Sequence, residues 1–273
     1  MTSSGESALK RNNHPPFLIK MEYSKIPTTK ISGSGRITIP EYGEFKVSGS
    51  GRISPEEIST SGSSRIPGGL TIRDLRTSGS ARVEGDIKAE IVKFSGSASV
   101  EGSLVCEEIT KSGSLRVDGD LKFKYGRFSG STKVEGSGAV ERELDASGSM
   151  AFSGDLVSED RILYTGVMRV EGKVKAGSFE ARLSKDESII NDGIEANYVN
   201  IQRSHEDWRN LGTLITTDIA GDEIILENVE CDNVTGKKIT ILSGCDIKGK
   251  VQYSESINID PNSRLENEPE KTE

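Results

Sequence analysis

Residues that commonly perform catalysis are few in this sequence, and they stand far apart. The two histidines are His14, in a polar N-terminal stretch, and His205, in the charged segment QRSHEDWRN. A catalytic histidine needs a partner within hydrogen-bond reach, and a lone loop histidine is far more often a surface residue. The cysteines Cys106, Cys231 and Cys245 lack the paired spacing of a zinc site and are odd in number. We therefore predict no catalytic residue, no metal site and no enzyme activity, and we interpret the cysteines as small buried side chains in a reducing compartment.

One short stretch matches a phosphate-binding loop in its letters. Residues 244–250, GCDIKGK, fit the first seven positions of that motif. Val251 replaces the Ser or Thr that would bind Mg²⁺, and the residues after it alternate like a strand, whereas the motif must open a helix. Residues 233–235 match a glycosylation site only in their letters, and no spaced set of Asp residues suits calcium. We predict no cofactor.

The strongest signal is a repeat centred on the tripeptide Ser-Gly-Ser. Its central glycine recurs at Gly33, Gly49, Gly62, Gly79, Gly96, Gly113, Gly130, Gly148 and, within Thr-Gly-Val, Gly166. The differences between successive positions in this series are 16, 13, 17, 17, 17, 17, 18 and 18. A short period of this kind indicates a one-dimensional stack of similar units.

Each position around this glycine keeps its own chemistry. An apolar side chain always stands four residues after it, at Ile37, Ile53, Ile66, Val83, Val100, Val117, Val134, Phe152 and Val170. One residue earlier the side chain is usually basic, as in Arg82, and one residue later it is often acidic, as in Glu84. This alternation is typical of a strand that buries one face. We interpret the charges as a solvated face on which basic and acidic columns offset each other, with a binding strip as the alternative.

The length of the repeat predicts the fold class. Seventeen or eighteen residues are too few for a strand, a helix and two turns, but they hold three short strands joined by bends. Stacked coils of this kind form an all-β, single-stranded parallel β-helix with neighbouring strands about 4.8 Å apart. The glycine columns mark corners that need a positive φ or a close approach of two backbones.

The repeat also divides the chain into parts. We predict a disordered N-terminal tail at 1–28, a regular β-helix of nine coils at 29–182, divergent coils at 183–260 with a protruding loop at 202–210, and a disordered acidic tail at 261–273. Pro40, Pro55 and Pro67 interrupt the first coils. Because proline cannot donate to a strand ladder, these coils are expected to be distorted or near an edge.

The overall composition excludes several classes of protein. The formal net charge of −8 argues against general nucleic-acid binding. No apolar run is long enough to predict a transmembrane helix, and the N-terminus lacks the apolar core of a secretory signal. We therefore expect a cytoplasmic protein. Residues 17–19, Phe-Leu-Ile, beside Lys20 could touch a membrane peripherally, but they are too short for stable anchoring alone.

The tandem coils SGSARVEGDI, SGSASVEGSL and SGSLRVDGDL resemble the bactofilin family, the polymer-forming cytoskeletal proteins of prokaryotes. The segment IAGDEIILENVECDNVTGKKITILSGCDIKGKVQY is similar to the more degenerate C-terminal portion of the longer, two-part members. The similarity covers about residues 30 to 255. It implies a right-handed β-helix, nucleotide-independent assembly into non-polar filaments, and a scaffold role in cell shape or membrane-associated organisation. The greater length, the loop at 202–210 and the acidic tail depart from short members, which makes a related bactofilin-like subunit an alternative partner to the chain itself.

Physical reasoning favours self-assembly independently of the resemblance. An open β-helix ends in unpaired backbone groups, and each uncapped end is a template for another chain. The candidate assembly residues are Ile31, Ile37 and Ile39 in the first coil and Ile247, Val251, Tyr253, Ile257 and Ile259 in the last. We therefore expect a non-catalytic scaffold that assembles end to end. The alternative is a monomeric binding or adaptor protein whose tails cap both ends.

Two other β-helical classes fit the sequence less well. Left-handed β-helix acyltransferases need an apolar residue at every sixth position, but Ile91, Glu108, Tyr125 and Arg142 occupy equivalent places on one side of the coil. Ice-binding solenoids use flat columns of Ser or Thr, whereas two serines flanking a corner glycine are more simply explained by hydrogen bonding at the corner.

Overall fold

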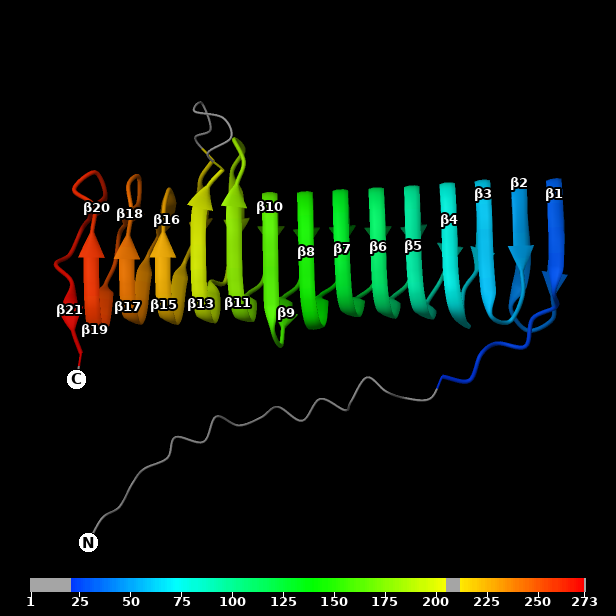
Figure 1. Ribbon diagram of the computed structural model, residues 1–273, viewed down its shortest axis with the longest axis horizontal. Coiled ribbons are helices and arrows are strands. Elements are labelled where there is room, and N and C mark those ends of the chain that lie inside the picture. The colour runs from blue at the N-terminus through cyan, green and yellow to red at the C-terminus, as the bar shows by residue number, and fades with distance from the viewer. Residues whose placement is uncertain (1–20, 205–211, 273) are drawn as a thin grey trace, which may run out of the picture.

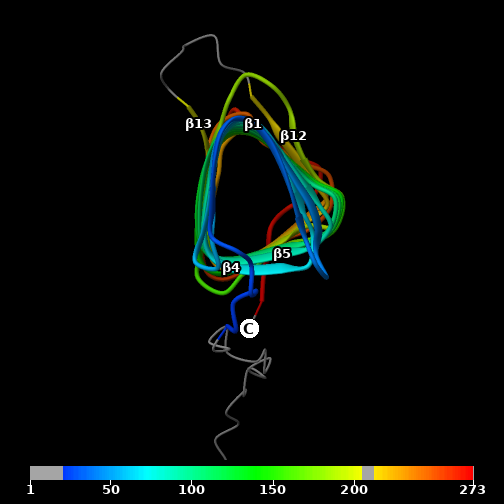
Figure 2. The same ribbon diagram turned by 90° about the vertical axis from the view of Figure 1, so that its right-hand side faces the viewer.

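The computed structural model describes residues 21–204 and 212–272, and these form one long β-solenoid (Figure 1). Within those ranges there is no helix, and 21 strands belong to one hydrogen-bonded sheet that winds through about 12 turns. Viewed from its N-terminal end, the winding encloses a three-sided outline (Figure 2). The prediction of an all-β solenoid is confirmed.

The strands are long in the N-terminal half and alternate between long and short in the C-terminal half. The first eight are β1 (Thr29–Ile39), β2 (Gly43–Ile53), β3 (Glu57–Pro67), β4 (Leu70–Glu84), β5 (Ile87–Val100), β6 (Leu104–Val117), β7 (Leu121–Val134) and β8 (Gly138–Phe152). The others are β9 (Leu156–Ser158), β10 (Arg161–Val170), β11 (Val174–Leu183), β12 (Ser188–Ile190), β13 (Ile194–Arg203), β14 (Leu214–Thr216), β15 (Asp218–Leu226), β16 (Val229–Cys231), β17 (Asn233–Ile241), β18 (Asp246–Ile247), β19 (Val251–Ile259), β20 (Arg264–Leu265) and β21 (Glu270–Lys271).

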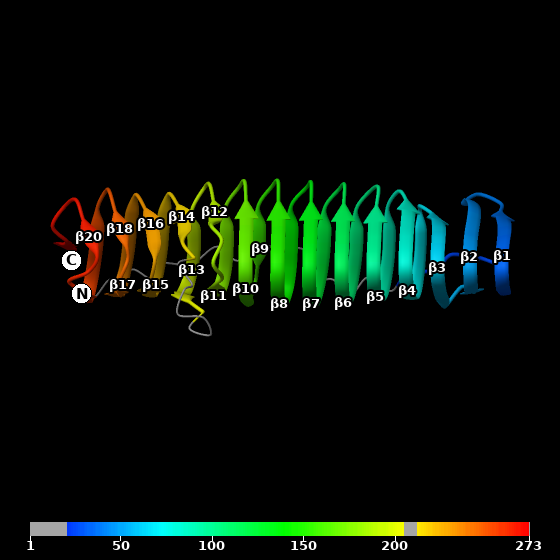
Figure 3. The ribbon, with the colours of Figure 1, turned by 90° about the horizontal axis from the view of Figure 1, so that it is seen from above.

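Strand β4 shows how one turn is built. Residues 70–72 form what we call the third side, residues 74–78 the first side, and residues 80–84 the second side, with Gly79 at the corner between the first and second sides. Strands β3 to β8 then stack in parallel, with Ser78 beside Ser95 and Ser95 beside Ser112. Consecutive turns therefore lie side by side along the rod (Figure 3), and the apolar column predicted from the repeat lies in the core.

The corner glycines are required because the backbones of neighbouring turns touch there. Gly113 has a φ of +103°, and a Cβ atom at this position would lie 2.2 Å from the carbonyl oxygen of Gly96. The same carbonyl contact recurs at Gly79, Gly96, Gly130, Gly148 and Gly166. A residue with a side chain would meet both the strained backbone and the neighbouring turn.

The first two strands depart from the predicted parallel coils. β2 is antiparallel to both β1 and β3, with Gly33 opposite Gly49 and Gly49 opposite Gly62. Only three residues connect β1 to β2 and three connect β2 to β3, which is too short to build a third side, so the chain reverses. The prediction that nine coils begin at residue 29 is therefore wrong for β1 and β2, although these strands do lie at the edge, as their prolines indicate.

The reversal is possible because the corner segment has nearly the same chemistry in both directions. Residues 30–36, KISGSGR, and 46–52, KVSGSGR, each carry a cation three residues before and three after the central glycine. In the antiparallel register Ile31 lies opposite Gly51, and Val47 lies opposite Gly35. Each of these two pairs sets a bulky side chain beside a glycine near the corner, so the antiparallel strands fit together there.

Both predicted tails are partly ordered. In the N-terminal segment 23–26, which we call the strap, the Ser24 N–H donates to the Thr71 carbonyl over 2.7 Å, and the Thr71 N–H donates to Ser24 Oγ over 2.9 Å. Ile26 is buried. At the other end, β20 pairs with β18 and β21 pairs with β19. The predicted disorder is thus wrong for residues 21–28, which bond to β4, and for most of 261–272, which pair with the last turns.

The predicted loop at 202–210 begins later than expected. Strand β13 continues to Arg203, with Gln202 beside Arg182 and Arg203 beside Leu183. Most of the rest of that loop lies outside the described residues, as do the segment 17–19 and both histidines.

Candidate functional site at the two ends

The cysteines lie in the core and are poorly suited to act as nucleophiles. All three are free thiols with at most 3% of their surface exposed. Burial raises the pKa of Cys106 and of Cys231 far above the ordinary range, and it raises the pKa of Cys245 to about 11. Because the thiolate is the reactive form, these side chains stay protonated near neutral pH, as the interpretation of buried filler residues requires.

The stretch that matches a phosphate-binding loop is a turn of the solenoid. Gly244 has a φ of +78°, and a Cβ atom there would lie 2.1 Å from Asn228 Oδ1. Strand β18 follows this glycine, and β19 begins at Val251 where the motif requires a helix. Within the described ranges, no group of three or more His, Cys, Asp or Glu side chains is arranged to hold a metal ion.

The charged columns of the second side are paired with one another. Arg65 Nε lies 3.1 Å from Glu84 Oε1 in the next turn, and Arg116 Nη2 lies 2.8 Å from Glu135 Oε1. Arg82 makes the equivalent ion pair with Glu101. These side chains are largely exposed, and each such pair contributes about 0–1 kcal/mol. The face is therefore a solvated ladder of paired charges, as the sequence predicts.

The two ends differ from the rest of the rod because apolar residues that pack against the core are incompletely covered there. Seven apolar residues pack against the core yet remain partly exposed, and they are Ile31, Ile37, Tyr42, Tyr253, Ile257, Ile259 and Leu265. All seven belong to the first or last strands or to the turn between β1 and β2. Exposed apolar surface of this kind favours contact with another molecule.

The N-terminal end presents a free strand edge. Among the described residues β1 pairs only with β2, so its other edge carries unpaired N–H and C=O groups. Of the three predicted assembly residues here, Ile31 and Ile37 are half-buried, whereas Ile39 has only 2% of its surface exposed.

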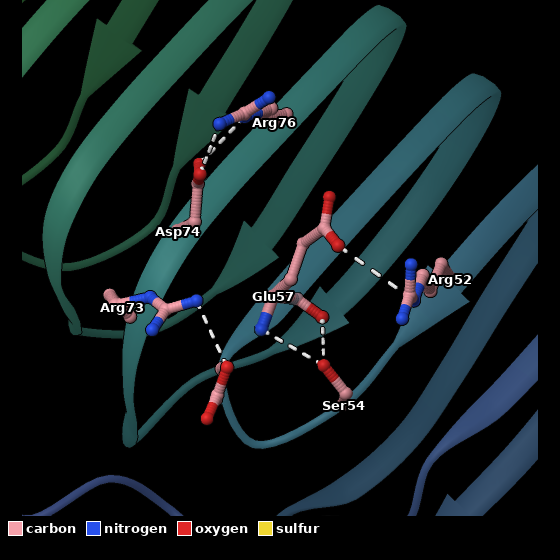
Figure 4. A network of polar contacts seen from close by, with 7 residues as sticks. Arg52, Ser54, Glu57, Arg73, Asp74 and Arg76 are labelled. Atoms are coloured by element: carbon pink, nitrogen blue, oxygen red, sulfur yellow. Dashed lines mark hydrogen bonds and ion pairs between the residues drawn. The ribbon is translucent and has the colours of Figure 1, made fainter.

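A polar network holds the reversal at this end in place (Figure 4). Ser54 bridges the turn, since its Oγ accepts the Glu57 N–H over 3.0 Å. Arg73 Nη2 lies 2.9 Å from Glu56 Oε2, which ties the turn to β4. The buried Asp74 carboxylate accepts two hydrogen bonds from Arg76. These contacts hold the turn between β2 and β3 against β4, and this turn is the reversal that sets β2 antiparallel to β3.

The C-terminal end also has a free edge. Strand β19 pairs with β17 along most of its length, but β21 covers it only at Gln252 and Tyr253. Residues 256–259 therefore have no partner strand on their outer edge within the part of the chain that the structure describes. Ile257 and Ile259 are half-buried there.

Two predicted assembly residues lie deeper than the sequence suggested. Ile247 and Val251 are fully buried, because the residues after 260 form β20 and β21 over them. A charge at Val251 is expected to disturb the core of the rod as well as any contact between rods.

The sequence analysis missed the strap and the outer strands β20 and β21. Tyr23 donates a hydrogen bond to Glu90 of β5, and Ile26 packs into the core. The available signal was the alternation of residues 23–26, in which Ser24 and Ile26 point inward. This segment was too short and too polar to stand out from a tail.

Comparisons with known proteins identify one relative and no family. The chain is 33% identical over 95 residues to the uncharacterized protein YhbF of Bacillus subtilis strain 168. The aligned region covers 34% of this chain and 40% of YhbF, so the chain spans well under half of that relative. No family model and no solved structure matches the chain. Among the described residues, none lies in a helix long and apolar enough to cross a membrane.

Proposed function

We propose that this protein is a non-catalytic scaffold that assembles end to end into filaments without a nucleotide. The rod would be a parallel β-helix that is right-handed, as the bactofilin resemblance implies, with coils of seventeen or eighteen residues, as the glycine spacing implies. The pairing of Ser78 with Ser95 supports the coil length, since their numbers differ by 17. The filament would act in the cytoplasm in cell shape or spatial organisation, with membrane contact through the N-terminal tail as a further possibility.

The observation that carries the proposal is the pair of open ends. The second side of the rod carries paired charges and offers few sites for association with another molecule. At the ends, β1 and residues 256–259 offer free strand edges with partly exposed isoleucines beside them. Backbone pairing across such an edge and burial of the isoleucines would both stabilise an end-to-end joint. The partner at each end is a second copy of the chain or a related subunit.

The test is negative-stain microscopy and sedimentation velocity of the full-length protein without nucleotide. We expect rods several molecules long. The variant Ile259→Lys places a charge at the C-terminal end and should shift the sedimentation profile toward monomer. Val157→Lys is the matched control, because Val157 is 40% exposed on the wall of the rod away from both ends.

The outcomes separate the alternatives. Loss of rods in Ile259→Lys with an unchanged far-ultraviolet circular dichroism spectrum supports assembly through the ends. Equal loss in Val157→Lys would point to side-by-side association and contradict the proposal. A wild-type protein that stays monomeric at every concentration would favour the monomeric adaptor instead.

A further inference from the structure

The two ends of the solenoid are complementary to each other in strand direction, apolar columns, charge and shape. We propose that copies of the chain stack head to tail, with the C-terminal end of one rod on the N-terminal end of the next, which gives the filament a direction. This inference rests on the proposed end-to-end assembly and goes beyond it by naming which end binds which. It also departs from the non-polar filaments that the family resemblance implies.

Strand direction permits a continuous stack. β2 is antiparallel to β1 and to β3, so the two reversals return β1 to the direction of β3. The later strands continue in parallel as far as β19. A β1 strand placed beyond β19 of another copy would therefore extend the same parallel ladder. A two-fold joint between N-terminal ends would instead have to pair β1 antiparallel with itself.

The apolar columns also continue across a head-to-tail joint. Following strand partners along the rod shows that Ile31 and Ile259 occupy one inward column. Its members are Ile31, Gly51, Thr60, Thr77, Phe94, Lys111, Phe128, Ala146, Tyr164, Ala181, Ile201, Leu226, Ile241 and Ile259. Ile31 and Ile259 are both half-buried. A head-to-tail joint places them side by side and completes their burial.

The second side behaves in the same way. Arg36 and Arg264 begin and end one outward column, and each is followed by a partly buried apolar residue, Ile37 or Leu265. The joint would bring Ile37 against Leu265. Glu266, which lies 3.7 Å from Arg264, would also come close to Arg36 and offset the two like charges.

The ends carry opposite charge. Strand β1 contains Lys30 and Arg36 and no acidic residue, although Arg36 Nε already lies 2.8 Å from Glu44 Oε1 of β2. Residues 255–272 contain five acidic residues, namely Glu255, Asp260, Glu266, Glu268 and Glu270, and two basic ones, Arg264 and Lys271. Two C-terminal ends would repel each other, whereas a C-terminal end and an N-terminal end attract. High salt should weaken this attraction.

The two ends have opposite relief on the third side. At the N-terminal end this side stops at β4, because β1, β2 and β3 contribute only to the first and second sides, and the strap covers the step. At the C-terminal end the third side projects furthest, since β21 lies beyond β19. A head-to-tail joint sets the projection, which is one strand deep, toward the step, which is three strands deep and partly filled by the strap. A joint between two N-terminal ends would face two steps and leave a gap.

Disulfide cross-linking between added cysteines can measure the polarity. Lys30 and Asn258 are exposed and share one outward column, the neighbour of the Ile31 and Ile259 column. Partners on adjacent strands lie close enough for a disulfide. We expect an equimolar mixture of full-length Lys30→Cys and Asn258→Cys proteins to form a disulfide-linked dimer on a non-reducing gel. Neither variant alone should form this dimer, and wild type serves as the control because its own cysteines are buried.

A second mixture tests the two-fold alternative. If β1 paired with another β1 in the register it keeps with β2, Lys30 would face Arg36 of the other copy, just as it faces Arg52 within the chain. A cross-link in the Lys30→Cys plus Arg36→Cys mixture, or in Asn258→Cys alone, would overturn the polar stack and leave self-assembly intact. Filaments without a cross-link in any mixture would also overturn it. Monomers throughout would overturn both this inference and the proposed function.

Discussion

The N-terminal and C-terminal halves of the rod turn the same corner by different means. In β4 to β8 one uninterrupted strand passes around a glycine of positive φ. After Gly166 the corner position is taken by Leu183 and then by Arg203. There the strand ends at the corner, and a separate short strand, such as β12 or β14, resumes on the second side.

This difference shows what the glycine contributes. A glycine lets two turns touch through their backbones and keeps each turn short, so that Gly79 lies beside Gly96, a difference of 17 in residue number. Without the glycine the coil length varies, because the partners Leu183 and Arg203 differ by 20 in residue number and the partners Leu226 and Ile241 by only 15. Regular spacing therefore accompanies the glycine column, and the C-terminal half, which lacks that column, has coils of unequal length and no clear period.

The largest expected effect comes from placing a side chain at a stacked corner. Gly113→Ala should destabilise the rod by about 3–5 kcal/mol, because the methyl group meets the Gly96 carbonyl in addition to the strained backbone. Gly33→Ala is the matched control, since Gly33 has a φ of +89° but no atom within 4 Å of the added Cβ. It should cost only about 1–2 kcal/mol. Urea midpoints measure both, and equal losses would show that the contact between turns is unimportant.

A smaller effect is expected at the boundary between the two halves. The Met168 N–H donates to Ser188 Oγ over 3.1 Å, and the same Oγ lies 2.5 Å from the Tyr164 hydroxyl oxygen. That hydroxyl donates to the Gly166 carbonyl over 2.7 Å. Tyr164→Phe breaks this buried chain beside the last corner glycine and should cost about 1–3 kcal/mol. Tyr125→Phe, at a 45% exposed position, should change stability by less than about 0.5 kcal/mol. Similar urea midpoints for the two variants would contradict a structural role for the buried chain.

The smallest effect concerns a lysine that lies in an inward column of the regular half. Lys111 is 2% exposed, and its Nζ donates to the carbonyls of Gly113 and Ser131 over 3.1 and 2.6 Å. Burial lowers its pKa to about 8, below the value of about 10.4 expected in the unfolded chain. Lys111→Met should therefore stabilise the rod by about 1 kcal/mol at pH 7.

The pH dependence provides the check on Lys111. Between about pH 8 and pH 10 the unfolded chain binds a proton that the folded chain has released, so the stability of wild type rises with pH in this window. Lys111→Met lacks this term, and its advantage over wild type should shrink as the pH rises from 8 to 10. A constant difference across that range would show that Lys111 does not titrate there.

Much of the fold followed from the sequence because its repeat is local and periodic. Three features depend only on residues at fixed offsets, and they are the steps between corner glycines, the inward column from Val83 to Val134, and the paired arginines and glutamates. A stack repeats the same neighbours in every turn, so these features recur along it. The free strand edges at both ends also follow from the sequence, since the first and last strands of any open solenoid have one, whereas their role in assembly stays a prediction. Ile39, Ile247 and Val251 were placed too near the surface, because their exposure depends on segments outside the repeat.

By itself, the sequence determined an all-β solenoid with glycine corners and a thin apolar core, because those features require only side chains at regular spacing. Only the tertiary structure decided that β1 and β2 reverse, that the strap and β21 cover parts of the ends, and that Ile31 and Ile259 share one column. The residues 30–36 and 46–52 are nearly identical, and their chemistry suits a parallel or an antiparallel neighbour. The short connecting turns show in the repeat as steps of 16 and 13, but the direction of each strand depends on packing between distant segments, which the repeat does not show.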